Sequence, residues 1–304
     1  MDCAVSLDGV TKSFDGHTAV ENLSLRVPTG SVYGFIGPNG SGKTTTLRII
    51  MHILLADLGT VEVLGRPQSR AANDEVGYLP EERGLYRKMG VRRLLRYFAT
   101  LKGMGAGDAD REIDYWLARL DLSAWAERRA ETLSKGMSQK LQFIVAVISR
   151  PRLVILDEPF TGLDPVNLEV MRDAILELRA RGATVILSTH DMGLAEEMCD
   201  FICMVFRGAK VLDGTLDSIQ SRYGTDTVRL RIDGGSAHLA DCPGLESVHD
   251  LGRFQEVRLK SDPQELLRRL TARTVVHHFE VVRPSLRDIF IRIAGIENGE
   301  DGSA

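Results

Sequence analysis

"SVYGFIGPNGSGKTTTLRII", residues 31–50, contains the pattern that best indicates the fold of this chain. It opens with an apolar run bounded by glycines, which is typical of a buried strand. It continues with "GPNGSGKT" at 37–44, which matches the pattern G-x-x-x-x-G-K-[ST], and "KTTTLRIIMHIL" at 43–54 places apolar residues at helical spacing. Strand, glycine-rich loop and helix in this order form the context that a phosphate-binding loop requires.

Each residue type in this loop has a chemical reason to be there. Glycines allow backbone N–H groups to turn inward around a β-phosphate, and the helix N-terminus adds partial positive charge. We expect Lys43 to pair with the β- and γ-phosphates of a nucleotide, and the Thr44 hydroxyl to ligate Mg²⁺. The predicted nucleotide-binding residues of the loop are Gly37, Pro38, Asn39, Gly40, Ser41, Gly42, Lys43, Thr44 and Thr45.

Two later strand ends carry the remaining candidates for chemistry. In "LVILDEP" at 153–159, Asp157 can hold Mg²⁺ through water and Glu158 can polarise the water that attacks a γ-phosphate. In "STH" at 188–190, His190 can donate a hydrogen bond to the γ-phosphate and help to orient that water. Taken singly, the acids are also compatible with a solvated strand end, and the histidine with a structural role. Together with the loop, they predict a nucleoside triphosphatase with Glu158 and His190 as catalytic residues.

Strands and helices alternate along the first part of the chain, which predicts an α/β fold with a largely parallel sheet. The stretch from 84 to about 150 is mostly helical and is expected to be a helical subdomain inserted between strands of this P-loop NTPase core. "SRYGTD" at 221–226 looks like a boundary, so the first domain is expected to span 1–222.

The remainder, 223–304, is predicted to be a small α+β domain. Ser285 and Asp288 form a capping box at the start of the last helix, and Gly295 is placed to close it. The tail "ENGEDGSA" at 297–304 is expected to be disordered. The predicted strands are "TVRLRID", "FQEVRLK" and "VVHHFEVV", and the predicted helices are "DPQELLRRLTA" and "PSLRDIFIRIAG".

Composition narrows the class of protein. The formal net charge is −4, so no overall basic field points to nucleic acid. The longest apolar runs, such as "LQFIVAVIS" at 141–149, are far shorter than the roughly 18–20 residues needed to span a bilayer. The start "MDCAVSLDGV" shows neither the basic nor the apolar region of a signal peptide. Cys199 and Cys203 have no second cysteine pair nearby, so buried or free thiols are expected rather than a metal site.

The motifs of the chain, taken in their order, resemble those of a known protein family. The chain contains, in sequence, "GPNGSGKTT", "GYLPEERGLY", "LSKGMSQK", "LVILDEP", "TGLDP" and "STH". This series resembles the ATP-binding subunit of an ABC transporter, and the likeness covers residues 1–220. The final "RPSLRDIFIRIAG" resembles the C-terminal extension found in the drug- and sodium-exporter branch of that family.

The resemblance implies roles for several residues to which the chemistry of the motifs assigns none. Phe14 falls where the family has an aromatic residue that stacks on adenine, although a core phenylalanine would also fit there. Ser134 and Gly136 of "LSKGM" would supply a hydroxyl and a backbone N–H to the γ-phosphate of ATP held by a second subunit. Lys135, Met137 and Asp164 would lie at the same partner-facing site.

Two departures from the family pattern concern this chain in particular. The family has L-S-G-G-Q where this chain has Lys135 and Met137, and Lys135 is expected either to bring positive charge to the dimer face or to point into water. A helix start without any ligand is the plain structural alternative for the stretch. The family usually has Gln where this chain has Glu81, which can still ligate Mg²⁺ but brings negative charge close to the γ-phosphate. The charges around Glu81 also fit a solvated cluster.

The expected function is ATP hydrolysis, with Mg²⁺, by a dimer of cassettes that powers transport through a separate polytopic membrane permease. The C-terminal extension favours export, and the chain is expected at the cytoplasmic face of the membrane as a peripheral subunit.

An ABC-type ATPase acting on ribosomes or DNA is the alternative. Those relatives usually carry two cassettes or a long coiled-coil insertion, and this chain has one set of motifs and only about ninety residues between the two phosphate motifs. A nucleotide-dependent regulatory module is a third hypothesis, which the presence of Glu158 and His190 disfavours. The cargo, and whether the second ATP-binding subunit is the same chain, are left open.

Overall fold

The computed structural model describes residues 2–68, 75–82, 84, 86–223, 227–239, 242–260 and 262–300, with side chains to 295. The chain divides into two compact units, Met1–Leu216 and Asp217–Ala304, which are described separately. Part of the predicted boundary "SRYGTD" and two positions of "GYLPEERGLY" lie outside the described residues. No helix in the described part of the chain is both long enough and apolar enough to cross a membrane.

A six-stranded sheet forms the centre of the first unit. All neighbouring strands are parallel except the edge pair β10–β9, which confirms the predicted α/β fold. Every residue of the three central strands β3, β8 and β7 is buried, because helices or a second sheet cover both faces. The strand order is β10 (Ala209–Gly214), β9 (Phe201–Phe206), β3 (Val32–Ile36), β8 (Thr184–Thr189), β7 (Leu153–Asp157) and β6 (Val76–Leu79).

An antiparallel sheet that the sequence did not predict as a separate layer stands beside the parallel one. Its first two strands are joined at Asp15 and Gly16, whose positive φ angles of 46° and 84° suit a tight hairpin. A shared apolar core between the two sheets also buries the inner face of helix α1 (Lys43–Ile50). The order is β2 (His17–Pro28), β1 (Cys3–Phe14), β4 (Leu58–Val63) and β5 (Arg66–Pro67).

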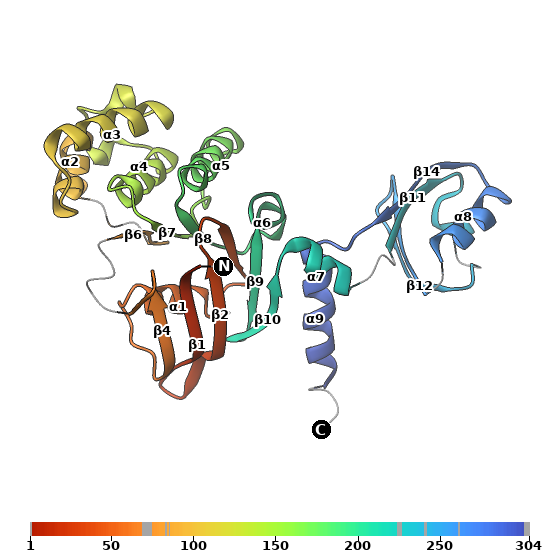
Figure 1. The fold of residues 1–304 in the computed structure, drawn as a ribbon. Helices are drawn as coiled ribbons and strands as arrows, with labels where there is room; N and C mark the ends of the chain where they lie inside the picture. The colour runs from red at the N-terminus through yellow and green to blue at the C-terminus, as the bar shows by residue number, and fades with distance from the viewer. Residues whose placement is uncertain are drawn as a thin grey trace. The chain divides into compact units, whose positions relative to one another are not determined.

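Helices fill the stretch that the sequence predicted to be a helical insertion. Figure 1 shows α2, α3 and α4 grouped together, away from the antiparallel sheet. Trp116 and Phe143 meet edge to face in their core, with ring centroids 5.7 Å apart. The helices of the first unit after α1 are α2 (Val91–Leu101), α3 (Ala106–Arg119), α4 (Lys135–Val147), α5 (Pro165–Ala180) and α6 (Met192–Met198).

The second unit is an antiparallel sheet with helix α8 (Pro263–Thr271) packed against one face through a small apolar core. The sheet order is β12 (Leu245–Asp250), β13 (Gln255–Leu259), β11 (Thr227–Ile232) and β14 (Val276–Val282). The sequence missed β12, which is mostly exposed and so lacks a buried apolar face. A short helix, α7 (Leu216–Arg222), precedes the sheet.

The last helix, α9 (Leu286–Glu300), confirms one prediction and corrects two. The capping box is present: the Ser285 amide donates to the Asp288 carboxylate and the Asp288 amide to the Ser285 hydroxyl, each over 3.1 Å. Gly295 does not close the helix, which continues to Glu300, and the predicted disordered tail is therefore helical over 297–300. The rest of that tail, 301–304, lies outside the described residues.

Candidate functional site

Two glycines of the loop 37–45 are required by their surroundings. Gly37 has φ 154°, and a Cβ there would lie 2.2 Å from the Val205 carbonyl oxygen. Gly42 has φ 99°, and its Cβ would lie 2.3 Å from the Ala19 carbonyl oxygen. Both contacts are with backbone that cannot yield, so any side chain would displace the loop. The conformation of the loop is therefore fixed by its close packing against the backbone of strands β9 and β2.

Lys43 is held inside this loop. Its side chain is buried, and Nζ donates to the carbonyl oxygens of Gly37 at 2.8 Å and Pro38 at 3.0 Å. Burial lowers the pKa of Lys43, and the nearby carboxylates of Glu158, Asp157 and Glu81 act in the opposite direction. A cation fixed across a loop of inward-facing backbone is suited to bind a phosphate chain.

A cavity of about 360 Å³ opens in front of the loop. Its volume lies at the lower end of the range typical of small-molecule sites. Pro38 and Ser41 of the loop do not line the cavity, and the Ser41 amide donates to the Pro38 carbonyl oxygen at 3.3 Å. The residues that line the cavity are Ala19, Asn39, Gly40, Gly42, Lys43, Thr44, Thr45, Glu81 and Glu158.

The two acids at the end of β7 occupy different positions. Asp157 is fully buried, whereas Glu158 follows it with φ 51° and reaches the cavity lining. The Glu158 amide donates to the Ser188 carbonyl oxygen at 3.0 Å, which ties the turn to strand β8. A positive φ is uncommon at a non-glycine residue, and here it accompanies the turn that follows β7.

His190 contacts Glu158 directly. The distance between His190 Nδ1 and Glu158 Oε1 is 2.9 Å. The two residues meet because β7 and β8 are neighbours, with Asp157 paired to Ser188 in the register. His190 is thus placed to orient the Glu158 carboxylate, a contact that the sequence did not predict.

The oxygen ligands at this site fit Mg²⁺. Neither carboxylate oxygen of the buried Asp157 accepts a hydrogen bond from the residues that the structure describes. A buried, unpaired carboxylate is costly unless a cation offsets it. No three His, Cys, Asp or Glu side chains in the described chain converge as a metal site, but Mg²⁺ needs only one or two carboxylates besides phosphate oxygens and water. Thr44 and Glu81, in the cavity lining, are the other candidate ligands.

The segment 134–137 lies elsewhere, since none of its residues lines the cavity. Ser134 caps α4, its side chain accepting a hydrogen bond from the Met137 amide at 3.2 Å, and Ser134 and Lys135 are exposed. Asp164 caps α5 in the same way, its carboxylate accepting a hydrogen bond from the backbone amide of Asn167 at 2.9 Å. This hydrogen bond, and after it one from the Asn167 side chain, lower the pKa of the Asp164 carboxyl.

Lys135 lies across Gly162, which has φ 76°. A Cβ at Gly162 would lie 2.6 Å from Lys135 Cε and 2.8 Å from its Nζ. The exposed Lys135 side chain therefore lies over the loop that precedes α5.

Phe14 is not brought to the cavity. It lies at the end of β1 with 42% of its surface exposed, and Lys12 Nζ stands 5.3 Å from the centre of its ring. Its proposed stacking on adenine stays a prediction.

Sequence reasoning missed two contributors to the site. Ala19 lines the cavity from β2, and Gln139 donates to the Pro159 carbonyl oxygen at 3.1 Å, tying α4 to the segment after β7. Alanine carries no chemical signal, and a glutamine in an apolar helix is noticeable only when its buried partner is known. Both depend on contacts between distant parts of the chain.

Comparison with known proteins agrees with this geometry. The model of the ABC transporter family matches residues 20–161, and that of the C-terminal domain of DrrA1-3-like ATP-binding proteins matches residues 214–294. The uncharacterized ABC transporter ATP-binding protein YhaQ of Bacillus subtilis (strain 168) is 38% identical over 96% of this chain and 98% of its own length. Nod factor export ATP-binding protein I of Rhizobium sp. (strain N33) is 33% identical over 97% of this chain and 98% of its own.

Solved structures give the same result. An ATP-binding subunit of an ABC transporter superposes with a TM-score of 0.69 at 28% identity, covering 73% of this chain and 93% of that one. An ATP-binding cassette in its ADP conformation, at 23% identity and a TM-score of 0.62, shows the fold alone. The family match and the relatives at 38% and 33% identity favour a transporter subunit over the alternative of an ATPase acting on ribosomes or DNA. The chain belongs to the ABC transporter family, as an ATP-binding subunit that carries a DrrA-like C-terminal domain.

Proposed function

We propose that two copies of this chain face each other head to tail and enclose two ATP molecules, each held by the loop 37–45 of one copy and the segment 134–137 of the other. The observation that carries the proposal is that Ser134 and Gly136 stand at the exposed start of a long helix but line no part of the chain's own phosphate cavity. Such a helix start suits an anion supplied from outside the subunit.

Hydrolysis within each enclosed site follows from the cavity lining. Glu158 polarises a water whose oxygen bonds to the γ-phosphorus, while the bond to the bridging oxygen breaks and ADP leaves with the electron pair. The proton of the water passes to the Glu158 carboxylate or to the departing phosphate, and His190 holds that carboxylate in position over 2.9 Å. Lys43 stabilises charge on the β- and γ-phosphates.

Mg²⁺ would neutralise part of the charge on the phosphates. Thr44 and Asp157, with Glu81 at the cavity wall, are the residues that would hold it. Glu81 brings negative charge to a wall where the family usually has Gln, and its proposed role is that of a Mg²⁺ ligand that ATP binding does not require.

The direction of transport is proposed to be export through a separate membrane permease, with which subunits of this family typically pair. The relatives named for Nod factor export and the DrrA-like C-terminal domain support this direction. The chain would then lie at the cytoplasmic face of the membrane as a peripheral subunit. ATP would favour the closed dimer because both copies contact its γ-phosphate, and hydrolysis would remove that differential contact.

The experiment is gel filtration of a Glu158→Gln variant with and without ATP and Mg²⁺. The variant keeps the phosphate cavity but loses the carboxylate, so ATP should accumulate and the chain should elute as a dimer only with ATP. The matched control combines Glu158→Gln with Lys43→Ala and should remain monomeric. A Glu158→Gln chain that binds ATP and remains strictly monomeric would contradict the proposal.

A further inference from the structure

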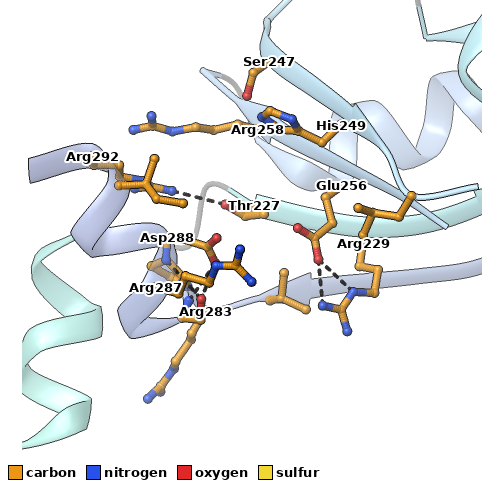
Figure 2. Close-up of a pocket in the computed structure, with 15 residues that line it drawn as sticks. Thr227, Arg229, Ser247, His249, Glu256, Arg258, Arg283, Arg287, Asp288 and Arg292 are labelled. Atoms are coloured by element: carbon orange, nitrogen blue, oxygen red, sulfur yellow. Dashed lines mark hydrogen bonds and ion pairs between the residues drawn. The ribbon is translucent and has the colours of Figure 1, made fainter. Parts of the chain in front are cut away.

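The second unit contains a charged pocket that the function proposed above does not use. It has a volume of about 710 Å³ and lies between one face of the sheet and the first turns of α9 (Figure 2). Side chains alternate along the strands, so Val228, Leu230 and Val257 face the core under α8 and the residues between them face this pocket. The pocket is therefore built on the sheet face that α8 leaves uncovered.

Arginine dominates the charge of the pocket. Five arginines and two carboxylates line it, which gives the lining a net charge of +3 with histidine neutral. The arginines come from strands β11 and β13, from the segment between β14 and α9, and from α9: Arg229, Arg258, Arg283, Arg287 and Arg292. The chain as a whole has a net charge of −4, so this concentration of positive charge is local.

The two acids of the lining are already engaged. Glu256 accepts from Arg229 at 2.7 Å, and Asp288 accepts from the hydroxyl and the amide of Ser285 in the capping box of α9. The helix start is thus satisfied by its own chain and is not the source of the attraction. In the residues that the structure describes, the exposed Arg287 has no ion-pair or hydrogen-bond partner for its side chain.

The other arginines make contacts that a stronger ligand can replace or share. Arg258 pairs with Glu246 at 2.9 Å, and Arg283 pairs with Asp217; neither acid lines the pocket. All four partners keep at least a third of their side-chain surface exposed, so water screens these pairs. In Figure 2, Arg258 and Arg292 extend toward the same end of the pocket, with the Arg229–Glu256 pair at the other.

We propose that this pocket binds a phosphate-bearing anion. The planar guanidinium forms paired hydrogen bonds with phosphate oxygens and is the side chain best matched to that geometry. Several arginines round one cavity can contact two phosphate charges together, which a single surface arginine cannot. The side chains of Leu251, Val282 and Ile291 supply apolar surface beside the charge, so the ligand has room for a hydrocarbon or sugar portion.

The same chemistry is offered by a lipid headgroup and by a free phosphate compound, and the experiment separates them. Every protein carries Lys43→Ala, so that the phosphate cavity of the first unit does not bind the probe. The pocket variant adds Arg258→Gln and Arg287→Gln, and the matched control adds Arg268→Gln and Arg273→Gln, two exposed arginines outside the pocket. Calorimetry measures binding of inorganic pyrophosphate, and sedimentation measures binding to phosphatidylcholine vesicles with or without phosphatidic acid.

We expect the parent and the control to bind pyrophosphate alike, and the pocket variant to bind it roughly tenfold more weakly. Sedimentation with phosphatidic acid vesicles that pyrophosphate reverses identifies a lipid headgroup as the ligand source, and pyrophosphate binding without sedimentation identifies a soluble phosphate. Arg287→Gln alone, on the exposed face of α9, repeats the test with little risk to folding. Absence of binding to both probes, or equal binding by the parent and the pocket variant, overturns the proposal.

Discussion

The loop 37–45 and the segment 134–137 both lie at the start of a helix, but their surroundings differ. Each stands at the N-terminus of a helix, α1 and α4, where free backbone N–H groups favour an anion. The loop is wrapped by two strands, holds a buried lysine and faces a cavity. The segment is capped by its own serine, is partly exposed and faces none of that cavity. A helix N-terminus becomes a complete anion site where other chain segments enclose it, so in the proposed dimer the second region would supply half of a site.

The largest effect should come from the enclosed region. Lys43→Ala removes a buried, hydrogen-bonded cation from the phosphates, and losses of this kind cost about 3 kcal/mol, or roughly 150-fold in ATP affinity. Equilibrium titration with fluorescent ATP measures it, with Lys260→Met as the control that removes an exposed lysine of the second unit. Unchanged affinity in the Lys43→Ala variant would show that the cavity is not the nucleotide site.

Ser134→Ala should distinguish the role of the segment 134–137 from that of the loop 37–45. Nucleotide binding by the single chain should be unchanged, whereas turnover should fall about tenfold to a hundredfold because a hydrogen bond to a charged phosphate is lost. Steady-state phosphate release at saturating ATP gives the value. Ser134→Asp is the matched variant: it keeps a side chain able to cap α4 but repels phosphate, so it should be equally stable and still less active. Full activity in both variants would exclude any contact with ATP.

Lys135→Met tests what the positive charge of Lys135 contributes. Methionine retains the hydrocarbon stem that lies over Gly162 and removes only the charge. The proposed dimer would place this exposed charge near the partner's phosphates, where it would be worth under about 1 kcal/mol. Turnover should then fall roughly twofold to fivefold, with the difference shrinking at high salt. An effect that persists at high salt would mean that Lys135 acts through packing instead.

Glu81→Gln should have the smallest effect. Glu81 lines the cavity and its negative charge acts on Lys43, so the neutral residue should leave ATP binding intact and hydrolysis present. The exposed neighbour Glu82 provides the control variant, Glu82→Gln. Complete loss of turnover in the Glu81→Gln protein, measured at saturating ATP and Mg²⁺, would instead make Glu81 an essential ligand.

The sequence predicted what is local and missed what depends on contacts between distant segments. Loop 37–45, its helix and the capping box at Ser285 follow from residues within a few positions of one another. Glu158 and His190 follow two different strands, and Lys135 contacts Gly162 across 27 positions of the chain. No fixed spacing in the sequence therefore indicates either contact. The arginine pocket of the second unit is assembled from alternate residues of several strands and α9, a pattern that in sequence looks like an ordinary solvated face.

Mixing two inactive chains tests whether each ATP site is shared between two copies of the chain. One chain carries Lys43→Ala and the other Ser134→Asp, and each alone should show almost no ATP hydrolysis. A head-to-tail pair of the two contains one site with both changes and one site with an intact loop 37–45 facing an intact segment 134–137. We expect ATPase activity to appear on mixing and to saturate as either chain is added in excess. Two chains that each bind a partner with ATP but remain inactive in every mixture would contradict it.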